Sequence, residues 1–203
     1  MAVIMIWESY YWKRDLLSTV SWLKRNRNKF VSAEGDTSEE LLVKLEKRIL
    51  IGFYSIRKLL EAKKLSEKIC TYQLPVQYFK NIKNVDHFNW HKIDELFDLD
   101  SSCGEHIKLV VLVNYFIHSY IFLPSFEDEL LSGMLISSDR VKNKKLYFIT
   151  TEQIYSLFTL AGSDYPNEIQ AWRNTEGEFD IKLKTVGTDN CDTITSEKHS
   201  NEN

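Results

Sequence analysis

Apolar residues recur at steps of three and four along two stretches of the chain, the spacing of one face of an α-helix. The first stretch covers residues 7–28. The second covers residues 38–67, where one apolar stripe is formed by Leu42, Leu45, Ile49, Phe53, Ile56 and Leu60. About 30 residues rising about 1.5 Å each give a rod on the order of 45 Å long, so we predict that this second helix is the spine of the fold.

A third stretch, Glu105 to Phe122, is apolar almost all round and is followed by Pro124. This pattern predicts a helix that is buried on every side and stopped by the proline. The stretch is shorter than the ~20 apolar residues that span a bilayer, so we predict a core helix and not a membrane span. Upstream of it, the irregular pattern predicts a short helix at residues 90–97 and a loop at residues 98–102.

The pattern changes after residue 130. Short apolar runs between polar turns predict four strands, at residues 133–138, 144–150, 168–172 and 179–183. Between the two pairs, Thr150 and Gln153 form a capping-box pattern that predicts a helix ending at Ala161.

These elements predict an α+β protein with a mainly α-helical body and a small C-terminal β-β-α-β-β portion. The predicted boundaries are residues 1–130 for the body and residues 131–186 for the portion packed on it. Residues 187–203 are polar and lack periodicity, so we predict a disordered tail.

Composition excludes several classes of protein. The 203 residues include 26 Lys and Arg against 29 Asp and Glu, a net charge of −3, so no global positive field attracts nucleic acid or membrane. With 7 glycines and no phosphate-binding glycine motif, no nucleotide or other cofactor is expected. The 3 cysteines lie far apart, and the apolar start of the chain lacks the basic region of a signal peptide. We therefore expect a cytoplasmic protein.

Asn114 and His118 lie four residues apart, on one face of the predicted buried helix. Each needs a hydrogen-bond partner there, because an unpaired buried polar group costs roughly 1–3 kcal/mol. One interpretation is that both side chains only fix helix packing. The other is that His118 is a general acid–base oriented by Asn114, since a free imidazole titrates near neutral pH.

The pattern Asn114-x-x-x-His118, preceded by a long amphipathic helix, resembles the HEPN superfamily over about residues 38–122. The resemblance implies a small α-helical and often dimeric domain. Active members are metal-independent ribonucleases of toxin and phage-defence systems. Their motif is an arginine, then four to six intervening residues, then a histidine, commonly with a polar residue right after the arginine.

Carried over to this chain, Asn114 matches the polar position and His118 matches the histidine. Val113 stands at the arginine position, so ribonuclease activity would need Arg57 or Arg140 to supply the cation in space. The segment Gly52–Leu65 also resembles uncharacterised bacterial proteins, which names no activity.

Three further groups of residues are candidates for contacts. Basic residues beside an aromatic ring predict a nucleic-acid or partner contact, or a solvated turn, at Lys142, Lys144, Lys145 and Tyr147. His87 and His91 have the spacing of a shared zinc site on a helix, but we favour a surface turn and expect no metal site. Aromatic residues crowd the first helix at Tyr10, Tyr11, Trp12 and Trp22, which suggests either a protein interface or packing under the β portion.

Three functions stay open. The leading hypothesis, whose setting comes from the resemblance alone, is a degenerate HEPN-like interaction module of a bacterial defence or toxin–antitoxin type system. It is not an enzyme, and it binds a protein partner or a second copy; RNA is a further candidate. The alternatives are a metal-independent endoribonuclease that uses His118, and a structural dimerisation protein without an active site. A ribonuclease needs His118 in an open, positively charged cleft near an arginine, whereas an interaction module buries His118 and exposes an apolar patch.

Overall fold

The structure is a computed structural model that describes residues 6–32, 36–173, 175, 177 and 179–184, and the predicted tail lies outside them. Its helices are α1 (Ser9–Asn26), α2 (Lys29–Ser32), α3 (Asp36–Glu61), α4 (Glu67–Cys70), α5 (Ile93–Leu96), α6 (Leu109–Ile117) and α7 (Thr151–Gly162). Its strands are β1 (Gln73–Asn81), β2 (Phe97–Lys108), β3 (Ser119–Glu127), β4 (Leu130–Ser138), β5 (Lys145–Thr150), β6 (Glu168–Arg173) and β7 (Phe179–Lys184).

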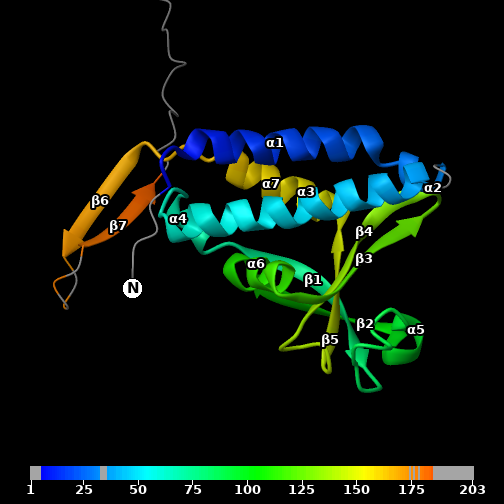
Figure 1. The fold of residues 1–203 in the computed structure, drawn as a ribbon. Helices are drawn as coiled ribbons and strands as arrows, with labels where there is room; N and C mark the ends of the chain where they lie inside the picture. The colour runs from blue at the N-terminus through cyan, green and yellow to red at the C-terminus, as the bar shows by residue number, and fades with distance from the viewer. Residues whose placement is uncertain (1–5, 33–35, 174, 176, 178, 185–203) are drawn as a thin grey trace, which may run out of the picture.

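Five of the strands form one antiparallel sheet in the order β2-β1-β5-β4-β3. The long helices α1, α3 and α7 lie on one side of this sheet, and α6 packs between α3 and the strands (Figure 1). Strands β6 and β7 form a separate antiparallel hairpin next to α4. None of the helices in the described part of the chain is long and apolar enough to cross a bilayer.

The prediction of a mainly helical body with a small C-terminal β portion is wrong. Three strands of the main sheet, β1, β2 and β3, lie in the part of the chain that was expected to be helical. The predicted helix at residues 105–122 is the 9-residue α6, and both of its ends belong to strands. The predicted loop at residues 98–102 is also part of a strand.

The physical reason is that β2 and β3 are the two edge strands of the sheet. Strand β2 is mostly exposed, so it lacks the apolar alternation that marks a half-buried strand. Strand β3 contains Pro124, which an edge strand tolerates because one of its sides needs no ladder hydrogen bond. Its β-branched and aromatic start, Tyr120-Ile121-Phe122, favours a strand over a helix.

Other predicted elements are present with small shifts of their ends: the two long helices as α1 and α3, and the four C-terminal strands as β4, β5, β6 and β7. The capping box of α7 is formed, with the Gln153 backbone N–H donating to Thr150 Oγ1 at 3.1 Å and the Thr150 N–H donating to Gln153 Oε1 at 2.9 Å. The main sheet joins strands from both sides of residue 130.

The main core lies between the helices and the sheet, and α3 passes through its centre. The Phe53 and Phe116 rings stack with centroids 3.6 Å apart and lock α3 against α6. Gly52 lets α7 approach α3 closely, because a Cβ there would lie 2.3 Å from the ring of Phe158. A smaller core on the other face of the sheet is built from Val85, Leu96, Phe97, Ile121 and Leu146, and Trp90 packs against it.

Candidate active site

The packing of α3 on α6 places Arg57 beside Asn114 and His118. Arg57 comes one turn after Phe53 on α3, and the stacked Phe116 lies between Asn114 and His118 along α6. His118 is the C-cap residue of α6, and its backbone N–H donates to the Asn114 carbonyl oxygen at 3.0 Å. The end of the short helix therefore turns the His118 side chain out to solvent.

The guanidinium of Arg57 joins these side chains into one network. Its Nη1 donates to Asn114 Oδ1 at 3.0 Å and lies 3.4 Å from His118 Nε2, at the long end of hydrogen bonding. Its Nε donates to Glu61 Oε1 at 2.7 Å. Glu61 also accepts from Lys58 Nζ at 3.1 Å, and the hydrogen bond from Arg57 is the main reason that the pKa of Glu61 lies below its ordinary value.

These groups open into a pocket of about 610 Å³, which we call the Arg57 pocket; it is lined by Arg57, Val111, Asn114, Tyr115, His118, Ser138, Asp139, Arg140 and Val141. Arg140 is exposed, and its guanidinium has no hydrogen-bond or ion-pair partner among the residues that the structure describes. The carboxylate of Asp139 already accepts from Lys142 Nζ at 2.8 Å. The pocket therefore presents two guanidinium groups, that of Arg57, which is paired with Glu61, and that of Arg140.

All four predicted catalytic candidates, Arg57, Asn114, His118 and Arg140, meet in this pocket. Sequence reasoning missed the role of Glu61 in holding Arg57, although the spacing of four residues on one helix is the signal of such a pair. It also missed Tyr115, which lines the pocket one residue after Asn114.

The four residues predicted to contact a nucleic acid or a partner differ in their surroundings. Lys142 is paired with Asp139 and lies over the Tyr120 ring, with its Nζ 3.7 Å from the centroid. Lys145 is bound by the Glu105 carboxylate, and Lys144 is exposed without a partner among the described residues.

Tyr147 is only 2 % exposed, so its ring is not open to a ligand. Its hydroxyl donates to Glu105 Oε1 at 2.7 Å, and burial raises its pKa.

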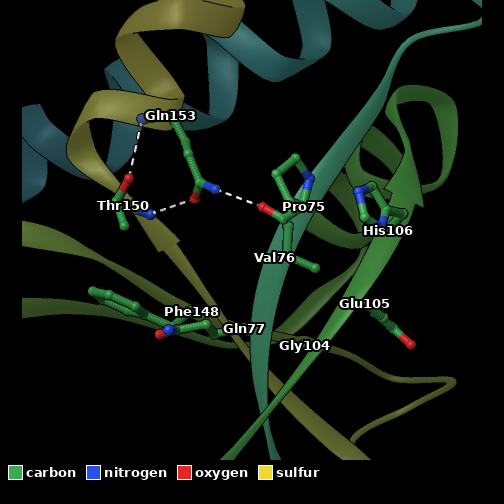
Figure 2. A pocket seen from close by; sticks show the side chains of 9 residues that line it. All are labelled: Pro75, Val76, Gln77, Gly104, Glu105, His106, Phe148, Thr150 and Gln153. Carbon is green, nitrogen blue, oxygen red and sulfur yellow. Dashed lines mark hydrogen bonds between the residues drawn. The ribbon is translucent and has the colours of Figure 1, made fainter.

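A second pocket, of about 500 Å³, lies where α7 meets β1 (Figure 2). Gln153 and Thr150 already make structural bonds in this pocket, because Gln153 Nε2 donates to the Pro75 carbonyl oxygen at 2.6 Å while Gln153 also closes the capping box with Thr150. The Glu105 side chain points away from Gln153 in Figure 2. Its carboxylate accepts hydrogen bonds from Lys145 Nζ and from the Tyr147 hydroxyl. This pocket does not join a histidine to a cation as the Arg57 pocket does.

A metal site is not indicated within the described ranges, where no three His, Cys, Asp or Glu side chains lie together in a way that could hold an ion. His87 and His91 are exposed and lie in a turn, not on a helix. Comparisons with protein-family models, with curated proteins and with solved structures found no match.

Proposed function

We propose that the Arg57 pocket binds a phosphodiester of RNA and that His118 transfers the proton during cleavage of the strand. The observation that carries this proposal is an exposed imidazole 3.4 Å from a guanidinium, in an open pocket with a second arginine that has no partner among the described residues. Guanidinium groups match phosphate oxygens in shape and charge. A histidine beside such a site supplies acid–base chemistry without a further cofactor.

RNA suits this set of groups because it carries its own nucleophile, the 2′-hydroxyl. In the proposed reaction, His118 Nε2 takes the proton of the 2′-hydroxyl while O2′ attacks the adjacent phosphorus. The bond from phosphorus to O5′ breaks, and the imidazolium returns the proton to the leaving O5′. The products are a 2′,3′-cyclic phosphate and a 5′-hydroxyl, and Arg57 and Arg140 stabilise the charge on the phosphorus oxygens.

Asn114 and Glu61 act through Arg57 in this scheme. Glu61 holds Nε and Asn114 holds Nη1, so the guanidinium is fixed before a ligand arrives. A donor that is already oriented needs no reorganisation when charge develops in the transition state. The HEPN resemblance supports the same chemistry, with the arginine supplied by α3 and not by the residue before Asn114.

A second candidate function is partner binding without catalysis, as a degenerate HEPN-like interaction module or a dimerisation protein. It is favoured by the exposed aromatic side chains of Tyr10 and Tyr11 on α1 and Tyr54 on α3. Of the two readings, the solvent exposure of His118 favours the ribonuclease.

The test is cleavage of a mixed RNA pool in EDTA by the wild type, His118→Ala and His91→Ala. His91 is the matched control, because it is an exposed histidine in a turn outside the pocket. We expect His118→Ala to lower the rate by about 100- to 10,000-fold, the usual contribution of a general acid–base, and His91→Ala to leave it unchanged. Products of the wild type should end in a 2′,3′-cyclic phosphate.

Two results would reject the proposal. One is a folded wild type that cleaves no RNA, and the other is cleavage that persists in His118→Ala, which indicates a contaminating nuclease. Circular dichroism of each variant shows whether equal amounts of folded protein are compared.

A further inference from the structure

The face of the main sheet that points away from α1, α3 and α7 is covered at only one end. There, α5 and the segment before it pack on the smaller core. The rest of this face is hollowed by a depression of about 350 Å³, which shares Gln77 and Phe148 with the pocket of about 500 Å³ at the start of α7. The depression takes lining residues from all five strands, so the face is concave, and we call this depression the sheet groove.

The apolar part of the sheet groove's lining is formed by Phe79, Leu99, Phe126, Leu135 and Phe148, beside the uncharged polar side chains of Gln77, Ser125 and Ser132. Leu135 and Phe148 are cross-strand partners and therefore lie on the same face. The Phe148 ring lies against Gly133, where a Cβ would come within 2.7 Å of the ring. Leu99 and Phe126 keep 37 % and 39 % of their surface exposed, so an occupant would bury apolar area that now contacts water.

The charges around the sheet groove are negative. Glu127 lines the groove, and Asp128 and Glu129 follow it in the turn between β3 and β4. None of these three carboxylates forms an ion pair with a residue in the described ranges, and no lysine or arginine lines the sheet groove or the adjoining pocket.

We propose that the sheet groove docks a peptide segment of a partner in which apolar side chains are flanked by lysine or arginine. The apolar floor supplies contact area, and the carboxylates select positive flanks and repel negative ones. The chain's own C-terminal residues do not fit, because Asp189, Asp192, Glu197 and Glu202 oppose a single Lys198. This inference does not depend on the proposed ribonuclease, since the sheet groove and the Arg57 pocket share no lining residue.

The probe is a fluorescein-labelled amphipathic peptide of leucine and lysine. The control peptide has the same sequence with glutamate in place of each lysine. Binding to the full chain is followed by fluorescence anisotropy. We expect the lysine peptide to bind at least about tenfold more tightly than the glutamate peptide. Leu99→Lys and Glu127→Lys should each weaken the lysine peptide by about tenfold, equivalent to about 1.4 kcal/mol.

The matched control variants carry the same two kinds of substitution, apolar to lysine and glutamate to lysine, on the outer face of α3. Ile51→Lys replaces an exposed apolar residue and Glu46→Lys reverses an exposed carboxylate, both outside the sheet groove. Both should change binding by less than about twofold, and thermal unfolding of all four variants verifies that they fold.

The proposal is overturned if both peptides bind equally, if neither binds, or if the α3 controls weaken binding as much as the groove variants. Sedimentation of the wild type and Leu99→Lys tests another occupant. Self-association that Leu99→Lys abolishes would assign the sheet groove to a second copy of this chain and not to a basic peptide.

Discussion

Two cations near the ends of the long helices, Lys13 on α1 and Arg57 on α3, differ in what they bind. Lys13 is 2 % exposed, and its Nζ donates to two backbone carbonyl oxygens, that of Lys64 at 3.0 Å and that of Asp164. The Tyr165 ring lies 4.7 Å from the same nitrogen. The Arg57 side chain is 35 % exposed, and it donates to the side chains of Glu61 and Asn114.

The comparison separates a structural cation from a candidate functional one. Lys13 links α1 to the residues that follow α3 and α7, and desolvation lowers its pKa, which the charge of Asp164 opposes. Its amine is already bound by the protein's own backbone. Arg57 leaves part of its guanidinium open to a pocket that also exposes His118. A buried cation bound to backbone points to stability, and a half-open cation bound to side chains points to ligand binding.

The largest expected effect on stability comes from Lys13→Met. The substitution leaves two carbonyl oxygens without their charged donor, so we expect the free energy of unfolding to fall by about 3 kcal/mol. Urea denaturation measures the loss. The control Lys144→Met, at an exposed lysine, should change it by less than about 0.5 kcal/mol. Equal stability of the Lys13→Met variant and the wild type would contradict the structural role of Lys13.

Arg57→Gln should affect the rate of RNA cleavage more than the free energy of unfolding. Because Glu61 keeps its bond to Lys58, we expect the free energy of unfolding to change by less than about 1 kcal/mol. RNA cleavage should fall by about 100-fold, because a charged donor aimed at the phosphate is lost. Rates are measured at equal folded fraction. A large loss of stability with an unchanged rate would place Arg57 with Lys13 as a structural cation.

Gly52→Ala tests the buried side of the helix that carries Arg57. The added Cβ would lie 2.3 Å from Cζ of Phe158, so the ring or α7 must move, at a cost of about 1–3 kcal/mol. Gly104→Ala is the control, since nothing lies within 4 Å of its added Cβ. Thermal unfolding compares the two variants, and an equal melting temperature for both would show that α3 and α7 are not tightly packed at this point.

The sequence was informative where one pattern decided the structure. The stripe from Leu42 to Leu60 predicted α3, and the Thr150–Gln153 pair predicted the start of α7. The edge strands β2 and β3 escaped prediction, because exposed strands need no apolar alternation and their pairing depends on distant residues. Arg57, Asn114, His118 and Arg140 could be named from residue type. The meeting of Arg57 with Asn114 and His118 depends on the packing of Phe53 on Phe116, and that of Arg140 with them depends on the end of β4, where the Asp139 N–H donates to the His118 carbonyl oxygen; no local spacing reveals either contact.

The smallest expected effect is a pH dependence of the Arg57–Glu61 bond. The hydrogen bond from Arg57 lowers the pKa of Glu61 below 4.5 in the folded chain. The folded state therefore holds fewer protons, and the stabilisation is present above that value and is lost as the pH falls through the folded pKa.

Because the pair is partly exposed, Glu61→Gln should cost at most about 1 kcal/mol near neutral pH. The difference from the wild type should shrink as the pH falls below 4.5 and through the lower pKa of the folded state. Urea denaturation across this pH range measures it. Glu46→Gln, at an exposed carboxylate on the same helix, is the control and should show no such trend. A difference for Glu61→Gln that stays constant with pH would mean that packing, and not charge, holds Glu61 against Arg57.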